Sequence, residues 1–204
     1  PAADQRVPAW VLPVLAEFGM TEESLQGFSY HVRNFADSGV PFWVCPGTSG
    51  WNSLVGRLSN ARANLDDAAL VGAASGATGY LITDWGDNGH MQPFAVSMMP
   101  LLEGAGLSWC RDSHPGQDLA ALLDRVGFTQ PVDGFGRMLE RLGCLAERTG
   151  LQGVNGSPLH EKLVGGGLPS DGTIDPDGVL FVLQELEDLM EELPEVTLPP
   201  AQAD

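Results

Sequence analysis

Apolar and polar residues alternate in two similar cycles through the first half of the chain. An apolar run followed by polar, Gly-bearing residues occupies 41–52, and residues 53–76 then keep small and apolar side chains on one helical face. The same order recurs at 78–93, and residues 95–109 are nearly free of charge, which is typical of a helix covered on several sides. The repeated order of strand, loop and helix predicts an α/β fold with parallel strands and helical crossovers.

The second half of the chain has helical spacing almost throughout. Residues 118–126 and 133–149 predict amphipathic helices, and residues 155–164 predict a turn followed by a short helix. A final helix is predicted at 178–193, with a stripe of Val and Leu residues on one side and acidic residues on the other. We expect that stripe to pack on its own domain and the acidic face to be solvated. The Pro-rich residues 194–204 are expected to be disordered.

These patterns divide the chain into four segments. They are a segment of βα units (1–112), a helical region (113–167), a Gly-rich linker (168–177), and an acidic amphipathic helix with a disordered tail (178–204).

Charge narrows the set of partners. The chain of 204 residues has 27 acidic residues against 10 Lys and Arg, a formal net charge of −17. Nucleic acids and anionic membrane surfaces require a basic patch, so neither is an expected partner. No apolar run approaches the length of a membrane span. Cys45, Cys110 and Cys144 are widely spaced and are interpreted as buried thiols, with no zinc or disulfide framework.

The sequence begins at Pro1 and not at Met, so the true start of the protein is hidden. Secretion therefore stays open, although a cytoplasmic location is favoured. No cofactor is expected from the sequence.

The densest chemistry follows the second predicted strand. Asp84, Trp85, Asp87, His90 and Gln92 lie within nine positions, in a loop that also holds two glycines. Side chains released at the end of a strand commonly build active sites in α/β folds. A sugar ring stacks its apolar face on Trp and donates its hydroxyls to carboxylates, so this loop predicts a carbohydrate site.

Trp51 and Asn52 leave the preceding strand, so they are expected at the same edge if the two strands are parallel neighbours. Each site residue also has a structural interpretation. Trp85 could pack at the rim, Asp87 could cap a turn, and Asp84 could pair with Arg57 or Arg62. His90 could act as a hydrogen-bond partner behind the site. Trp43 is predicted to lie in the core.

Three stretches resemble a known family. Residues 43–52, 60–64 and 79–90, the last containing Thr-Asp-Trp-Gly-Asp-Asn-Gly-His, resemble the C-terminal part of glycoside hydrolase family 20-like barrels, the β-N-acetylhexosaminidase type. The resemblance implies the C-terminal part of a (β/α)8 barrel followed by an α-helical region. It also implies a sugar-binding role for Trp85 and Asp87, whose spacing matches the family's Trp and carboxylate near the last strand.

The resemblance has one decisive departure. Such enzymes use an adjacent Asp-Glu pair to orient the substrate's N-acetyl group and to protonate the leaving oxygen, and no Asp-Glu dipeptide occurs in this chain. We therefore expect the acid/base pair to lie in the N-terminal part of the barrel, outside this chain, which alone would be inactive. Met91 also stands where an aromatic residue is expected. The expected activity of the whole protein is removal of terminal N-acetylhexosamine-type sugars.

Two other functions remain open. Asp84, Asp87 and His90 have ligand types suited to a divalent ion, which would indicate a metal-dependent hydrolase. A chain without the acid/base pair could instead be a non-catalytic carbohydrate-binding or interaction module. Because a few βα units cannot close a barrel, the isolated chain is expected to expose sheet edges and to aggregate.

Overall fold

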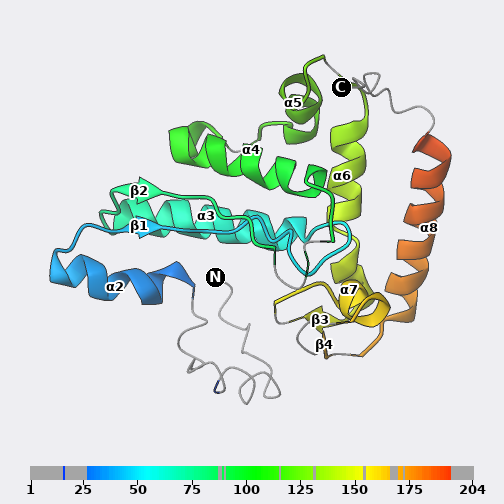
Figure 1. The fold of residues 1–204 in the computed structure, drawn as a ribbon, viewed down its shortest axis with the longest axis horizontal. Helices are drawn as coiled ribbons and strands as arrows, with labels where there is room; N and C mark the ends of the chain where they lie inside the picture. The colour runs from blue at the N-terminus through cyan, green and yellow to red at the C-terminus, as the bar shows by residue number, and fades with distance from the viewer. Residues whose placement is uncertain are drawn as a thin grey trace.

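The computed structural model describes residues 16, 27–86, 89, 91–114, 116–130, 132–153, 155–165, 170–171 and 173–193. Helices take most of these residues and strands take few (Figure 1). Residues 1–15 and 17–26 lie outside the described residues, as does the end at 194–204, for which disorder is predicted.

Two short parallel strands stand at the centre of the N-terminal half. β1 (Trp43–Val44) pairs with β2 (Gly79–Tyr80), and a bridge between Gly47 and Thr83 extends the pairing. Helix α2 (Phe28–Ser38) precedes β1, α3 (Leu58–Ala74) connects the strands, and α4 (Ala95–Cys110) follows β2. The predicted order of parallel βα units is confirmed. The predicted α/β class is only loosely consistent with the structure, because the chain is mostly helical and has few strands.

Helix α3 begins later than the predicted residue 53. Residues 53–57 stay in the loop that leaves β1, where Gly56 takes a φ of 86° that favours glycine. The helix then buries the predicted small-residue face, which includes Ala61, Leu65 and Ala68.

The helices cover one face of the strand pair. Val44 packs with Val32 of α2 and Ala68 of α3, while Ile82 packs against Leu65 and other residues of α3 and α4. The opposite face is open, and the prediction that Trp43 lies in the core is wrong. Its side chain is 60% exposed, because alternation along β1 turns Val44 toward the helices and Trp43 away from them.

The open face includes more than Trp43. Leu81 is exposed, and Cys45 is exposed rather than buried as predicted. Cys110 is exposed as well, while Cys144 is half-buried. The prediction of three buried thiols is therefore wrong for two of them.

A helical region packs on α3 and α4. It contains η3 (Arg111–Ser113), α5 (Leu119–Val126), α6 (Phe135–Gly143) and η4 (Ala146–Thr149). The predicted single helix 133–149 is broken after Gly143. The amide of Cys144 donates to Arg141 and that of Leu145 donates to Leu142, both at 3.2 Å, and such i to i−3 bonds tighten a final turn and end a helix.

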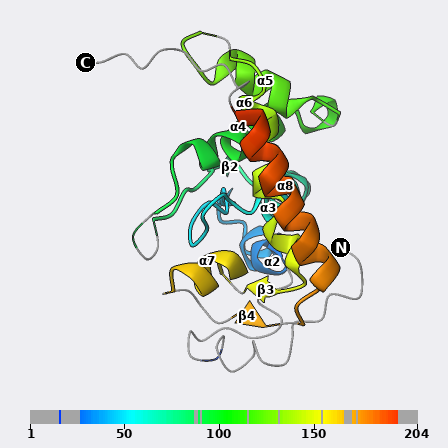
Figure 2. The same cartoon turned by 90° about the vertical axis from the view of Figure 1, so that its right-hand side faces the viewer.

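The C-terminal part begins with the antiparallel pair β3 (Gln152–Gly153) and β4 (Ser170–Asp171). Helix α7 (Pro158–Leu163) lies between these two strands in the sequence. Helix α8 (Pro176–Glu192) runs beside α6 (Figures 1 and 2). Helix α8 starts two residues earlier than predicted, because Asp175 caps it by accepting from the amide of Asp177. Among the described residues, no helix is long and apolar enough to cross a membrane.

Candidate functional site

The carboxyl ends of β1 and β2 bring Asp84 together with two hydroxyl groups. The amide of Thr48 donates to the carbonyl of Thr83 at 2.9 Å, which holds the two strand ends side by side. Oδ1 of Asp84 then accepts from the hydroxyl of Thr48 and, at 3.0 Å, from the hydroxyl of Ser97 in the first turn of α4. The Asp84 carboxylate is therefore fixed by one residue from the loop after β1 and one residue from α4.

The two arginines named as possible partners of Asp84 make other contacts. Arg57 donates through Nε to the carbonyl of Ser49 at 3.3 Å. Arg62 is bound instead to Glu103 and Glu140. Two hydroxyl groups therefore orient the carboxylate at the strand ends.

Gln92 is the second predicted residue at this place. It is only 4% exposed, and its Nε2 has no hydrogen-bond partner. A Cβ added to Gly50 would lie 2.8 Å from Ser97 Oγ, 3.4 Å from Asp84 Oδ1 and 3.5 Å from Gln92 Nε2. These three polar groups therefore converge on Gly50, which leaves room for them because it has no side chain.

Trp85 and Met91 are exposed residues of this loop. The Trp85 side chain is 56% exposed and follows Asp84 directly. Met91 is exposed to a similar degree. Asp87 and His90 lie outside the described residues, so their predicted roles stay predictions.

The loop after β1 holds two strained residues. Ser49 and Asn52 have φ of 56° and 49°, in the left-handed region that costs non-glycine residues about 1–3 kcal/mol. Side chains of α3 hold the loop, since Asn60 donates to the Ser49 hydroxyl at 2.7 Å and Asn64 accepts from the amide of Gly47 at 2.9 Å. Such strain persists only where surrounding bonds fix the backbone, and it is concentrated at functional sites.

Trp51 and Asn52 turn toward the helical region. The Trp51 indole donates to Oδ1 of Asn155 at 2.9 Å, and the Asn52 amide donates to the carbonyl of Asn155 at 3.1 Å. The guanidinium of Arg57 lies 5.3 Å from the centre of the Trp51 ring. These contacts connect the loop to the turn at Asn155. Of the predicted site residues, Asp84 and Gln92 therefore lie together, whereas Trp51 and Asn52 contact the neighbouring turn.

Four residues of this arrangement were missed from the sequence: Thr48, Ser97, Asn60 and Asn64. Three of them carry a usable signal. Ser97 is a polar residue in a largely apolar helix, and Asn60 and Asn64 stand one helical turn apart, so both amides reach the same loop.

The metal hypothesis gains no support from the part of the chain that the structure describes. There, no three His, Cys, Asp or Glu side chains are grouped to hold an ion. Because Asp87 and His90 fall outside that part, the three-residue ligand set remains untested. Comparison of the chain with protein-family models, curated proteins and solved structures finds no significant match.

Proposed function

We propose that this chain supplies part of the sugar site of a glycoside hydrolase that removes terminal N-acetylhexosamine-type sugars. The observation that carries the proposal is the Asp84 carboxylate, held by two hydroxyls at the ends of parallel strands beside the exposed Trp85.

The chemistry of these two groups suits a sugar. A fixed carboxylate accepts hydroxyl donors in charge-assisted hydrogen bonds, each contributing about 1.5–3 kcal/mol. The exposed indole offers an apolar face on which a sugar ring stacks. Since Ser97 and Thr48 already hold Oδ1, the carboxylate loses little freedom when a ligand binds.

On this proposal the chain forms the C-terminal βα units of a (β/α)8 barrel, followed by its helical region. The open face of β1 and β2 supports this, because Trp43, Cys45 and Leu81 face away from the covering helices. In a closed barrel that face would fill the interior against the other strands. The acid/base pair would come from those strands, so the chain alone binds without cleaving.

The test is a titration with N-acetylglucosamine, followed by tryptophan fluorescence. We expect a saturable change that is lost in Trp85→Ala and weakened at least tenfold in Asp84→Asn. Trp109→Ala is the matched control, because Trp109 is 92% exposed at the opposite end of α4. Unchanged binding in both Trp85→Ala and Asp84→Asn would refute the proposal.

A non-catalytic sugar-binding module is the second candidate. It is favoured by the same Asp84 and Trp85 arrangement together with the lack of an Asp-Glu pair in the chain. An assay with a chromogenic N-acetylglucosaminide separates the hydrolase from the binding module. It uses the protein that includes the remaining strands of the proposed barrel. A hydrolase would cleave this substrate, whereas a binding module would bind it and leave it intact.

A further inference from the structure

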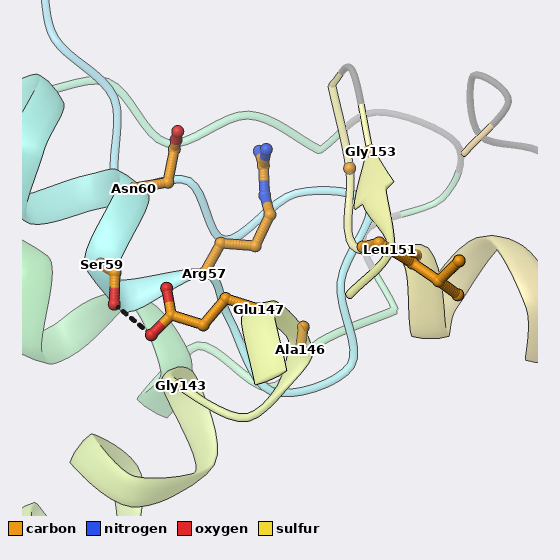
Figure 3. Close-up of a pocket in the computed structure, with 10 residues that line it drawn as sticks. Arg57, Ser59, Asn60, Gly143, Ala146, Glu147, Leu151 and Gly153 are labelled. Carbon is orange, nitrogen blue, oxygen red and sulfur yellow. Dashed lines mark hydrogen bonds between the residues drawn. The ribbon is translucent and has the colours of Figure 1, made fainter. Parts of the chain in front are cut away.

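A pocket lies beside the end of the loop that follows β1. It has a volume of about 140 Å³ and opens between the start of α3, the end of α6, η4 and the β3 strand (Figure 3). Arg57, Ser59 and Asn60 form one wall, and Glu147, Leu151 and Gly153 form much of the rest. None of these residues belongs to the sugar site proposed above.

Arg57 brings a positive charge to this pocket. Its Nε donates to the Ser49 carbonyl, its plane lies over Trp51, and its Nη2 is buried with no hydrogen-bond partner. No carboxylate among the described residues forms an ion pair with it, although acidic residues outnumber basic ones by 27 to 10 in the whole chain. Burial lowers the pKa of Arg57 to about 10, so it stays charged at neutral pH.

The start of α3 adds to the positive potential. Arg57 is its N-cap residue, and no side chain caps the helix and no acidic residue occupies its first turn. The free amides of that turn carry the positive end of a helix of 17 residues. A buried guanidinium beside them is costly unless an anion binds there.

The opposite wall limits what that anion can be. The Glu147 carboxylate lines the same pocket and accepts from the Ser59 hydroxyl at 2.9 Å (Figure 3). A dianion such as phosphate would be repelled by it, while a planar monoanion matches the guanidinium. Leu151 and Ala146 add a small apolar surface.

We propose that this pocket binds a small carboxylate ligand, with its anionic end at Arg57 and a hydroxyl or amino group facing Glu147. The ligand supplies the counter-charge that the fold leaves out, and its binding is independent of the sugar site.

The test compares thermal unfolding midpoints in sodium acetate, sodium glycolate, sodium phosphate and sodium chloride at matched ionic strength. Any salt screens the charges of a chain with this net charge and so shifts the midpoint without binding. Leu151→Trp fills the pocket without altering Arg57. The readout is therefore the midpoint shift in the wild type minus the midpoint shift in Leu151→Trp. At ten times the Kd we expect this difference to be about 3–6 °C for glycolate, smaller for acetate and zero for phosphate and chloride.

Further variants make the outcome decisive. Arg57→Gln should lose the glycolate shift, while Arg125→Gln, which removes an exposed arginine on α5, and Asp84→Asn should keep it. Because Arg57→Gln also releases Ser49, its result is accepted only when Leu151→Trp agrees. A glycolate shift that survives in Leu151→Trp, the absence of any glycolate shift, or an equal phosphate shift would overturn the proposal.

Discussion

At the scale of single residues, the Asp84 carboxylate depends on its two hydroxyl donors. Ser97→Ala removes one of them from a fully buried position, so we expect it to reduce the free energy of unfolding by about 1–2 kcal/mol and to weaken sugar binding. Urea denaturation measures the first effect.

Ser108 in the same helix is the matched control. It is exposed, and its hydroxyl bonds only to the carbonyl of Ala105. We expect Ser108→Ala to change the free energy of unfolding by no more than about 0.5 kcal/mol. Equal effects of the two substitutions would mean that Ser97 does not hold Asp84.

The Cys110 thiol is expected to react at a lower pH in the folded chain than in the unfolded chain. A hydrogen bond from the side chain of Ser113 lowers the pKa of Cys110, because it stabilises the thiolate over the thiol. In a chain with Cys45 and Cys144 replaced by Ala, alkylation of Cys110 should reach half its maximal rate at a lower pH than in the same chain unfolded in urea.

Ser113→Ala should move the midpoint of this pH profile upward, toward the value of the unfolded chain. An unchanged profile would show that the hydroxyl does not set the pKa.

The sequence predicted the place of Asp84 and Gln92 in the fold better than the groups that contact them. Asp84 and Gln92 were expected at the strand end because the apolar run and the polar loop mark that position. Thr48 and Ser97 were missed, since their approach to Asp84 depends on strand register and on how α4 packs. The Trp43 error has a related cause, because a two-residue strand does not reveal which of its faces the helices cover.

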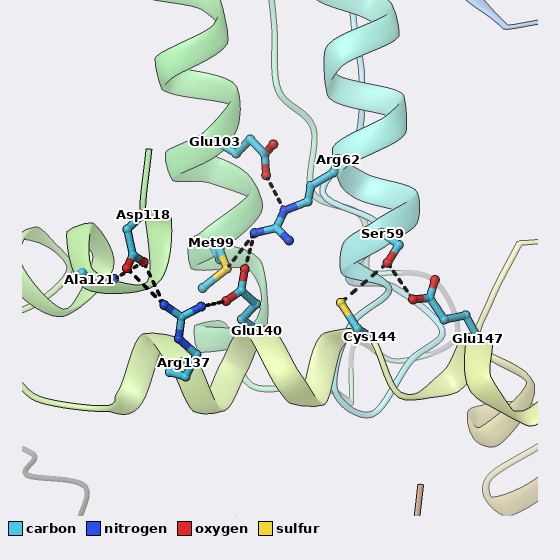
Figure 4. A network of polar contacts seen from close by, with 10 residues as sticks. All are labelled: Ser59, Arg62, Met99, Glu103, Asp118, Ala121, Arg137, Glu140, Cys144 and Glu147. Atoms are coloured by element: carbon cyan, nitrogen blue, oxygen red, sulfur yellow. Dashed lines mark hydrogen bonds and ion pairs between the residues drawn. The ribbon is translucent and has the colours of Figure 1, made fainter. Parts of the chain in front are cut away.

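At the scale of elements, one arginine joins three helices. Arg62 of α3 bonds to Glu103 of α4 at 3.1 Å and to Glu140 of α6 at 2.7 Å (Figure 4). Arg137 of α6 bonds in turn to Glu140 and to Asp118, the cap of α5. This series of ion pairs, which runs from Arg62 to Asp118, therefore connects the βα units to the helical region.

The two arginines allow a matched comparison. Arg62→Met leaves the shielded Glu103 without its cation and Glu140 with Arg137 alone, so it should cost about 2–3 kcal/mol in free energy of unfolding. Arg137→Met removes a more exposed cation and should cost less than about 1 kcal/mol. Chemical denaturation of both variants measures the difference, and equal costs would show that the Arg62 pairs contribute no more than surface ion pairs.

Helices with long periodic patterns were predicted well. Residues 95–109 and 118–126 match α4 and α5 within one residue at each end, because charge-free or amphipathic spacing leaves little choice. The break after Gly143 was not visible, since an apolar stripe continues through it. It follows from tertiary packing, because Gly143 lies against Leu58, where a Cβ would come within 2.8 Å of the Leu58 Cβ.

At the scale of the whole molecule, helices cover one face of the parallel strands in the described part of the chain, and the other face is open. The sequence indicated parallel βα units, and the structure contains them. The two described strands do not determine how many strands the complete sheet would contain, so the barrel remains a proposal. Its most direct physical consequence is that Trp43 and Cys45 should become buried when further strands are present.

Thiol labelling tests this consequence because the chain has its own control. Cys45 lies on the open face, whereas Cys110 is exposed at the end of α4. In residues 1–204 alone, both thiols should react with a maleimide. In the protein that includes the remaining strands of the proposed barrel, we expect Cys45 to react at least tenfold more slowly and Cys110 to react at an unchanged rate. Equal reactivity of Cys45 in both forms would mean that its face stays in water, and a closed barrel containing β1 and β2 would then be wrong.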